Sequence, residues 1–422
     1  MVVDCPHATP KWTDSGVVVL RNQNIKGGRL DLSTPSFTDE EHYKGRTKRA
    51  IPTAGDIVIT REAPMGDVCL IPEGLRCCLG QRQVLLRPDP NKVDARFLLF
   101  ALQSPYIQFQ IGWNEGTGST VSNLRIPVLE SLKIPTPPMP LQVEIATTLG
   151  ALDDRITLLR ETNATLEAIA QALFKSWFVD FDPVRAKMEG RIPEGMDEAT
   201  AALFPDGFEE SELGLVPRGW RVGRVSDLGD VICGKTPPTA QPENYGTDVP
   251  FITIPDMHNV LVVTATNRSL SRIGADTQRK KYLPPGSICI SCIATPGLVV
   301  RVTVASQTNQ QINSVVPLDV WRRAFPLFLL RRIGDAVRVA GSGGSVFHNL
   351  NKSGFEEIKV LLTTGDLAQR FDDIVEPLIS KIISNQMQAQ TLATLRDTLL
   401  PRLISGQLRL PVEPQKMEGV LQ

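Results

Sequence analysis

The chain has 422 residues, of which 42% are hydrophobic and 22% are charged, and its formal net charge is −1. This length allows two or three domains, each with a core of its own. No apolar leader is visible in "MVVDCPHATPKW" and no run of about 18 apolar residues occurs, so we expect a cytoplasmic protein without a membrane span. The seven cysteines are odd in number and lack framework spacing, which is typical of a reducing compartment.

Charge is distributed unevenly along the chain. The segments 1–140, 141–213, 214–365 and 366–422 carry net charges of +2, −9, +7 and −1. Local charge decides whether a surface contacts phosphate, more than total charge does. The two neutral-to-basic blocks are therefore compatible with a nucleic-acid partner.

The first block, residues 1–140, is predicted to be a globular unit of mixed α/β structure. The stretches "GDIVITREAP" and "VLLRP" carry β-branched residues between Gly and Pro, which predicts short strands. The run "DARFLLFALQS" (94–104) predicts a helix. A loop rich in Gly, Ser and Thr follows at 116–120.

The rest of the chain divides by the same criteria. A long helix is predicted over 141–180, and the acidic, Pro- and Gly-containing segment 181–215 is interpreted as a partly ordered linker. A second globular unit is expected over 216–365. A second long helix follows over 366–410, and residues 411–422 form a C-terminal tail.

The two halves of the chain resemble each other. "GDIVIT" (55–60) corresponds to "GSICIS" (286–291), and "GTGSTVSNLRIPVLESLKIP" corresponds to "GSGGSVFHNLNKSGFEEIKVL". Apolar positions in the long helices match at an offset of 226, beginning with Leu141 and Leu367. The chain is therefore predicted to be a tandem repeat of a globular unit followed by a long helix.

One part of the second half has no counterpart in the first. The lead-in "RGWRVGRVSDLGDVICGKTPP" precedes the second unit, whereas "VVDCPHATP" at the start of the chain aligns near "VICGKTPP". We therefore expect the first unit to lack its N-terminal lead-in, which is roughly one strand.

Each long helix carries a heptad pattern that predicts coiled-coil packing. The two series of apolar, small and occasional polar residues are Ile145, Leu149, Leu152, Ile156, Leu159, Asn163, Leu166, Ala170, Leu173 and Trp177, and Phe371, Val375, Leu378, Ile382, Asn385, Ala389, Leu392, Arg396, Leu399 and Leu403.

Each series contains one asparagine, a residue that can fix the register of a coiled coil. An antiparallel pair with Asn163 facing Asn385 would place Ile145 against Leu403, Ile156 against Leu392 and Trp177 against Phe371. The alternative is that each asparagine lies at a helix edge and faces solvent.

Two short patterns suggest chemistry that their surroundings do not support. "GDVICGKTPP" (229–238) matches the phosphate-binding pattern G-x-x-x-x-G-K-[ST], but Pro237 and Pro238 disfavour a following helix, and a nucleotide site needs that helix. We interpret this stretch as the opening loop of the second unit.

Cys289 and Cys292 form a lone C-x-x-C in "SICISCIA", which is interpreted as an apolar strand rather than a zinc or redox site.

The central and C-terminal stretches resemble one family specifically. "LDDRITLLRETNATLEAIAQALFKSWFVDFDPVRAKMEG", "LFPDGFEESELGLVPRGW" and "TLLPRLISGQL" are similar to the specificity subunits of type I restriction-modification systems, and the resemblance covers essentially the whole chain. It implies a mixed α/β (α+β) fold with two target-recognition domains, separated by two long antiparallel coiled-coil helices. Each domain would read one half of a bipartite double-stranded DNA site.

The same resemblance implies the partners. The helices would fix the spacing and dock two methyltransferase subunits, and restriction subunits would join through the complex. S-adenosylmethionine, ATP and Mg²⁺ would bind to those partner subunits, and this chain would hold no cofactor, metal or catalytic residue. A type I system of this kind modifies DNA and defends the cell against phage.

Candidate DNA-contacting residues are side chains that can reach phosphates or base edges. In the first unit they are Arg21, Asn22, Arg61, Gln81, Arg82, Thr117, Ser119 and Thr120. In the second unit they are Lys235, Lys280, Lys281, Gln310, Ser342, Ser345, His348 and Asn351. The basic stretches "KGRTKR" (44–49) and "QRKK" (278–281) are interpreted as phosphate patches or as solvated turns.

Three classes of function compete at this point. The chain is a DNA-reading scaffold, an enzyme (a methyltransferase or an ATPase), or a coiled-coil adaptor that binds only proteins. A methyltransferase should show an N/D-P-P-Y/F motif and a glycine-rich cofactor loop, and the sequence has neither. The basic repeats argue against the adaptor, which predicts no salt-dependent DNA binding.

Overall fold

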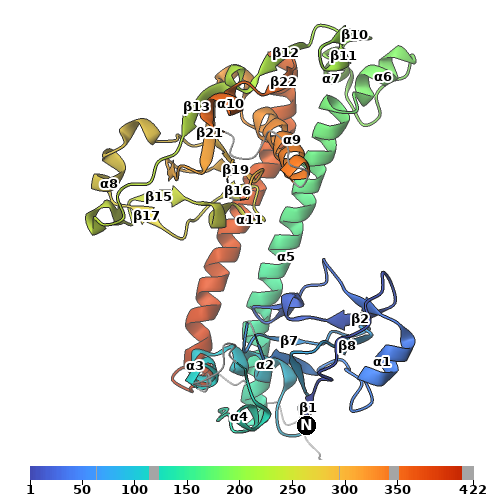
Figure 1. The fold of residues 1–422 in the computed structure, drawn as a ribbon, viewed down its shortest axis with the longest axis vertical. Helices are drawn as coiled ribbons and strands as arrows, with labels where there is room; N and C mark the ends of the chain where they lie inside the picture. Colours follow the sequence, from blue (N-terminus) through green and yellow to red (C-terminus); the bar gives the residue numbers. More distant parts are fainter. Residues whose placement is uncertain (63, 114–122, 294, 342–350, 411–422) are drawn as a thin grey trace, which may run out of the picture. The chain divides into compact units, whose positions relative to one another are not determined.

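The computed structural model describes residues 1–62, 64–113, 123–293, 295–341 and 351–410 (Figure 1). The chain forms two compact units. One comprises Met1–Thr157 and Gln390–Gln422, and the other comprises Leu158–Ala389. Each long helix therefore contributes one half to each unit.

The first unit is built around a four-stranded antiparallel sheet. Its order is β1 (Val2–Asp4), β9 (Gln83–Leu86), β6 (Ile57–Thr60) and β7 (Val68–Leu70). Strands β6 and β9 are buried throughout, as their runs of Ile, Val and Leu lead one to expect. A second sheet has the order β5 (Phe37–Thr38), β2 (Val17–Leu20) and β8 (Cys77–Leu79), with β2 parallel to β8.

Short elements complete this unit. A hairpin joins β3 (Ile25–Lys26) to β4 (Arg29–Leu30). The helices are α1 (Glu40–Arg46), α2 (Ala95–Gln103), α3 (Pro105–Trp113) and α4 (Ile126–Glu130). Helix α2 begins where the Asp94 side chain accepts a hydrogen bond from the Phe97 amide, an N-cap. The helix predicted at 94–104 is therefore confirmed.

The second unit repeats both sheets. The first has the order β13 (Gly229–Cys233), β21 (Ile312–Pro317), β18 (Ile288–Ser291), β19 (Val299–Val302) and β16 (Val262–Val263). The second has the order β14 (Tyr245–Gly246), β17 (Ser269–Leu270), β15 (Val249–Ile252) and β20 (Gln307–Thr308), with β15 parallel to β20. Helices α8 (Arg272–Asp276), α9 (Ala324–Gly341) and α10 (Lys352–Glu356) lie in the connections.

The strand register confirms the predicted repeat. Asp4 lies opposite Val84 in the first unit, and Cys233 lies opposite Asn313 in the second. The common offset of 229 residues makes β1 equivalent to β13 and β9 equivalent to β21. The strand pair β12 (Arg221–Arg224) and β22 (Lys359–Leu362) has no counterpart among the described residues of the first unit. The expected loss of a lead-in stays a prediction.

The segment predicted as a linker, residues 181–215, has more structure than expected. It contains α6 (Asp182–Met188), α7 (Glu198–Ala202) and most of the hairpin formed by β10 (Phe208–Ser211) and β11 (Gly214–Pro217). Aromatic side chains hold it to the unit, because Phe204 packs edge-on against Trp177 with ring centroids 5.2 Å apart. The sequence did not predict these helices and this hairpin, because the aromatic residues of the acidic segment follow neither the helix period nor the strand period.

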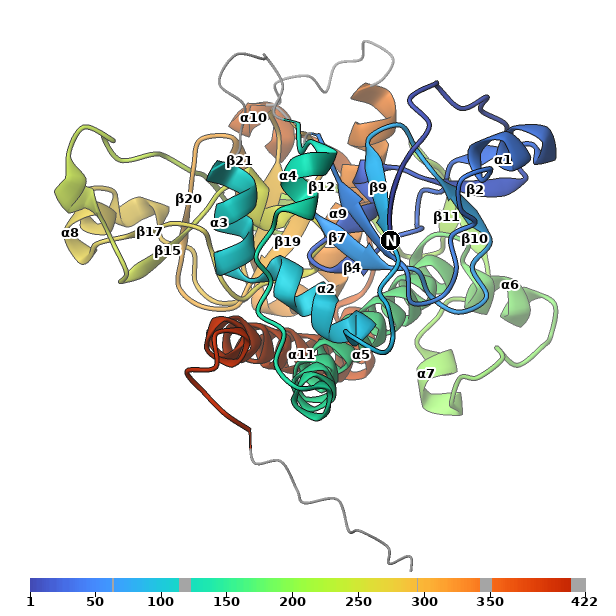
Figure 2. The same ribbon diagram turned by 90° about the horizontal axis from the view of Figure 1, so that it is seen from below.

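The long helices are α5 (Met139–Phe178) and α11 (Gly365–Ile404), each of 40 residues. Helix α11 ends where Gly406 adopts a φ of +74°, a left-handed conformation that favours glycine. Figure 2 shows the two helices end-on and side by side. In the first unit Ile145 and Leu149 share a buried cluster with Leu400 and Leu403.

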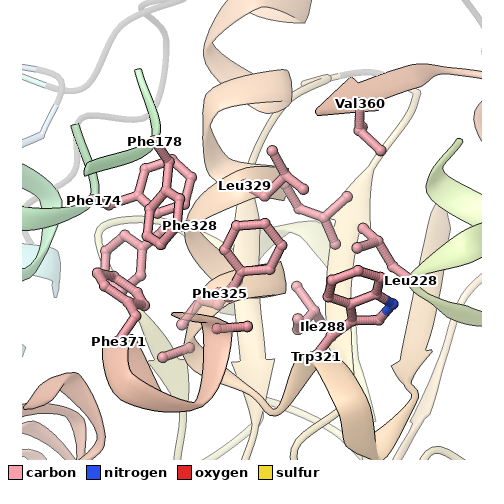
Figure 3. Packing of buried hydrophobic residues seen from close by; sticks show 14 of the residues in the cluster. Phe174, Phe178, Leu228, Ile288, Trp321, Phe325, Phe328, Leu329, Val360 and Phe371 are labelled. Carbon is pink, nitrogen blue, oxygen red and sulfur yellow. The ribbon is translucent and has the colours of Figure 1, made fainter. Parts of the chain in front are cut away.

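In the second unit the same two helices pack through aromatic residues. Trp177 contacts Phe371, with ring centroids 5.9 Å apart. Phe174 and Phe178 of α5, Phe325 and Phe328 of α9, and Phe371 of α11 meet in one cluster (Figure 3). Since the start of α11 meets the end of α5 here, and the reverse holds in the first unit, the predicted antiparallel coiled coil is confirmed.

Candidate nucleic-acid interface

Four loops of the first unit lie at the same end of its strands. They are residues 5–9 after β1, 21–24 after β2, 61–62 after β6 and 80–82 between β8 and β9. Strands β1 and β6 both run antiparallel to β9, so their C-terminal ends meet where β9 begins. We call these loops the first loop edge. The equivalent loops 234–238, 253–256, 292–293 and 309–311 form the second loop edge.

The two loop edges share their backbone hydrogen bonds. The Arg61 amide donates to the Arg82 carbonyl and the Cys292 amide donates to the Gln311 carbonyl, both at 2.9 Å. The Arg21 amide donates to the Asn24 side chain in a 3-10 turn, as the Thr253 amide does to Asp256. The frame is therefore the same in both units, although the side chains differ.

Glu62 organises the polar side chains of the first loop edge. Its carboxylate accepts from Arg82 Nε at 3.0 Å and from Asn123 Nδ2 at 3.0 Å, and its backbone carbonyl accepts from Asn22. Arg82 is exposed, so its remaining N–H groups are open to a ligand. Arg21 is also exposed and lies over the Trp12 ring, 5.3 Å from its centroid.

Arg61 has a different environment from the one expected for a DNA contact. Its side chain is buried, and it donates to Asp4 Oδ1 at 2.7 Å and to the Leu124 carbonyl at 3.0 Å. A guanidinium held by two internal acceptors stabilises the loop rather than projecting from it. The sequence alone did not distinguish this arginine from its exposed neighbours.

The second loop edge carries one lysine, Lys235. Lys235 is exposed, and its backbone carbonyl accepts from Gln278 Nε2 at 2.8 Å. Gln278 immediately precedes the 3-10 turn Arg279–Lys281, which contains Lys280 and Lys281. Two predicted residues, Lys235 and Gln310, therefore lie on this edge, where exposed Gln310 accepts a hydrogen bond from the Thr236 hydroxyl at 2.6 Å.

The glycines of the phosphate-binding pattern have a structural explanation. A Cβ atom at Gly229 would lie 1.9 Å from the Val316 carbonyl oxygen, and one at Gly234 would lie 2.1 Å from the Asn309 carbonyl oxygen. Both positions therefore require glycine for close approach of neighbouring backbones. No helix begins within 234–238, in keeping with the interpretation of this stretch as an opening loop.

The remaining candidate DNA-contacting residues lie elsewhere or have other roles. Thr117, Ser119, Thr120, Ser342, Ser345 and His348 lie outside the described residues. Asn351 caps α10, because its side-chain oxygen accepts from the Gly354 amide at 2.8 Å. Gln81 lies on the first loop edge, where its amide donates to the His7 carbonyl at 3.1 Å and to the Thr9 hydroxyl at 2.8 Å.

The cysteines and acidic residues show no metal-binding arrangement in the part of the chain that the structure describes: no group of three or more His, Cys, Asp or Glu side chains could hold an ion. Cys289 lies on β18, as predicted, and burial raises the pKa of its thiol to about 12. Burial likewise raises the pKa of Cys292 to about 11.

Within the described ranges, no helix is long and apolar enough to cross a membrane.

Sequence comparison identifies the family. The model of the type I restriction modification DNA specificity domain matches residues 13–168 and 217–390. The chain belongs to this family. It is 36% identical over 407 residues to the type I restriction enzyme HindI specificity subunit of Haemophilus influenzae, covering 86% of this chain and 88% of that protein.

Other relatives agree with this assignment. The type I restriction enzyme MjaIX specificity subunit of Methanocaldococcus jannaschii is 25% identical, over 88% of this chain and 81% of that protein. The crystal structure of the type I S subunit from M. genitalium superimposes with a TM-score of 0.52 at 17% identity, covering 93% of both chains, which supports the fold. As a specificity subunit, the chain has a non-catalytic role in a type I restriction-modification complex.

The sequence interpretation missed several residues of this specificity subunit. Glu62 and Asn123 were not singled out, although they connect three loops of the first loop edge. Arg46 was grouped with a basic stretch, whereas its guanidinium contacts backbone carbonyls. Comparison of the two repeats could have singled out Glu62. Its equivalent in the second unit is Ile293, so a charged residue stands in the first unit where the second has an apolar one.

Proposed function

We propose that this specificity subunit binds double-stranded DNA and that each recognition domain reads one half of a bipartite site. The observation that carries this proposal is the duplication of the loop edge. Two surfaces with one backbone frame and different side chains suit the reading of two different half-sites. Arg82 of the first unit and Gln311 of the second are equivalent positions with different side chains. Arg pairs well with guanine and Gln with adenine, so the two positions suit different bases.

The side chains of the two edges support DNA as the ligand. Lys235, Lys280 and Lys281 supply positive charge for phosphates, and Arg82, Asn22 and Gln310 supply donors that can reach base edges. Loops held by hydrogen bonds lose less conformational entropy on binding than free loops do. An adaptor that binds only proteins would not need such a polar, duplicated edge.

In this proposal the long helices are the spacer. A helix of 40 residues is about 60 Å long at 1.5 Å per residue, and one turn of DNA spans roughly 34–36 Å. A stiff helical pair would hold a fixed spacing, whereas a flexible linker would tolerate several. The helices would also dock two methyltransferase subunits, and restriction subunits would join through the complex.

The chemistry would reside on the partners. S-adenosylmethionine, ATP and Mg²⁺ would bind to the methyltransferase and restriction subunits, and the assembly would act in the cytoplasm. The Lys235 side chain would contact a DNA phosphate rather than a nucleotide. The tight backbone contacts at Gly229 and Gly234 explain both glycines without a bound nucleotide.

Base-resolution mapping of methylated adenines and cytosines in cells tests the proposal. Cells would express this chain with its methyltransferase subunits. We expect a bipartite motif with one fixed spacer length, and a continuous motif would contradict two separate readers. A mobility-shift titration over salt, with and without methyltransferase subunits, tests the adaptor alternative, which predicts no DNA binding under either condition.

A further inference from the structure

The loop after the first strand is anchored in both recognition domains, although the anchoring residues differ. In the first domain this loop is residues 5–9 after β1. In the second it is residues 234–238 after β13. Cys5 and Gly234 are equivalent, since the Cys5 amide donates to the Gln83 carbonyl and the Gly234 amide donates to the Ile312 carbonyl. Pro6 and Lys235, the next residues, are therefore also equivalent.

Arg46 anchors the loop of the first domain. It is the last residue of α1, and its three nitrogens donate to three backbone carbonyls. Nη2 donates to Pro6 at 3.1 Å, Nη1 to Ala8 at 2.8 Å and Nε to Leu79 at 2.9 Å. The fork of one guanidinium thus ties the loop to strand β8.

Gln278 has the equivalent place in the second domain. It follows α8, which occupies the same connection as α1, and only 7% of its surface is exposed. Its Nε2 donates to the Lys235 carbonyl at 2.8 Å and to Gln307 Oε1 of β20 at 2.8 Å. Strand β20 is the equivalent of β8, so both anchors join the same loop to the same strand.

A second contact holds each loop from the turn before β9 or β21. Gln81 donates to His7 and Thr9, and the equivalent Gln310 accepts from Thr236. The loop is therefore fixed on two sides. Its polar groups, among them His7, Thr9, Lys235 and Thr236, project from a backbone with little freedom.

We propose that Arg46 and Gln278 are equivalent positioning residues, each of which fixes the loop after the first strand of its domain and thereby sets the base preference of that half-site. This inference rests on the proposed function. Small errors in the placement of recognition groups weaken discrimination between bases, because a base pair is read through directional hydrogen bonds. The effect of each anchor should be confined to its own half-site.

The test uses the chain with its methyltransferase subunits and the two variants R46K and Q278M. Lysine keeps the charge of Arg46 but has all its N–H donors on one nitrogen, so it lacks the planar fork with which Arg46 reaches three carbonyls. Methionine keeps the size of Gln278 without its donors. K44M is the matched control, because Lys44 is an exposed cation on the same helix α1. Motifs are mapped by methylation, and affinities are measured on duplexes that carry single-base changes in the mapped motif.

We expect R46K to lower discrimination in one half-site by about tenfold and Q278M to do the same in the other. Each variant should leave the opposite half-site unchanged, and K44M should leave both unchanged. Retention of full discrimination by both variants would overturn the inference. So would an equal loss at both half-sites, or failure of both variants to form the complex, since either would make these residues general determinants of folding.

The outcome for the unaltered chain separates this inference from the proposed function. A continuous motif for the unaltered chain would reject the two-reader model itself. A bipartite motif that R46K and Q278M both retain would reject only the positioning role of the two residues.

Discussion

The side-chain amide of Asn385 donates a hydrogen bond to the side-chain oxygen of Asn163 at 2.9 Å. Asn163 in turn donates to the Ile382 carbonyl at 3.2 Å. Asn385 is buried and Asn163 is half-buried, so neither faces solvent in the way the alternative interpretation expected. Since a shift of register would leave these amides without partners, the pair fixes how α5 and α11 align.

The first prediction concerns that register. In the variant N163C/N385C, mild oxidation should form a disulfide in high yield, because the two side chains already meet across the seam. Non-reducing electrophoresis after proteolysis measures the cross-link. The control N163C/L378C, displaced by one heptad, should stay reduced. Preferential cross-linking of the displaced pair would show that the helices adopt another register in solution.

The second prediction concerns an ion pair within the coiled coil of the first unit. Arg396 occupies a heptad core position and donates to Asp153 Oδ1 at 2.6 Å, and Arg29 of the β3–β4 hairpin also contacts Asp153. D153N should lower the free energy of unfolding by roughly 3 kcal/mol, because the partly buried guanidinium of Arg29 loses its carboxylate partner and that of Arg396 keeps only Asp397. Urea denaturation measures the loss.

The neighbouring carboxylate is the control for that prediction. The side chain of Asp154 is 67% exposed and pairs with Arg96 at the surface. D154N should therefore cost less than about 1 kcal/mol, as exposed pairs usually do. Equal losses for D153N and D154N would mean that the Asp153 network adds nothing specific to the helix pair.

The third prediction separates a phosphate contact from a nucleotide site at Lys235. K235A should reduce the slope of log affinity against log salt by about 0.9, the contribution of one neutralised phosphate. The loss of affinity caused by K235A should be similar for cognate and unrelated duplexes. K359A, which removes a lysine paired with Glu212, should leave the slope unchanged. An unaltered slope for K235A would remove Lys235 from the interface.

The fourth prediction concerns thiol reactivity at the second loop edge. Six of the seven cysteines are buried, and burial raises the pKa of Cys69 and of Cys289 to about 12, so at pH 8 almost none of either is the reactive thiolate. Cys233 is half-buried and ends β13 at the second loop edge. Iodoacetamide at pH 8 should therefore label Cys233 first, as peptide mass analysis would show.

Bound DNA should slow this labelling. A duplex with both half-sites should protect Cys233, and a duplex in which the half-site read by the second domain is scrambled should protect it much less. Equal labelling rates with and without the cognate duplex would place the DNA elsewhere on the domain.

Some of the candidate site was predictable from the sequence, and the limit is clear from individual residues. Lys235, Gln310, Lys280 and Lys281 were selected as polar residues in loops, and the structure places Lys235 and Gln310 on one loop edge. Arg61 satisfied the same criterion but is buried against Asp4. Composition cannot separate these cases, because the acceptor of a side chain can lie anywhere along the chain.

The sequence by itself determined the features that repeat over short distances. Heptads in α5 and α11 place apolar residues on one face, and the single asparagine in each series defines the alignment, so register could be derived without coordinates. Only the tertiary structure decided that Arg46 and Gln278 have the same place. Their equivalence depends on carbonyl partners that are 33 to 43 residues away in the chain, and on different side chains that make the same kind of bond. Periodicity is a local property, whereas the pairing of a donor with a distant backbone acceptor exists only once the chain has folded.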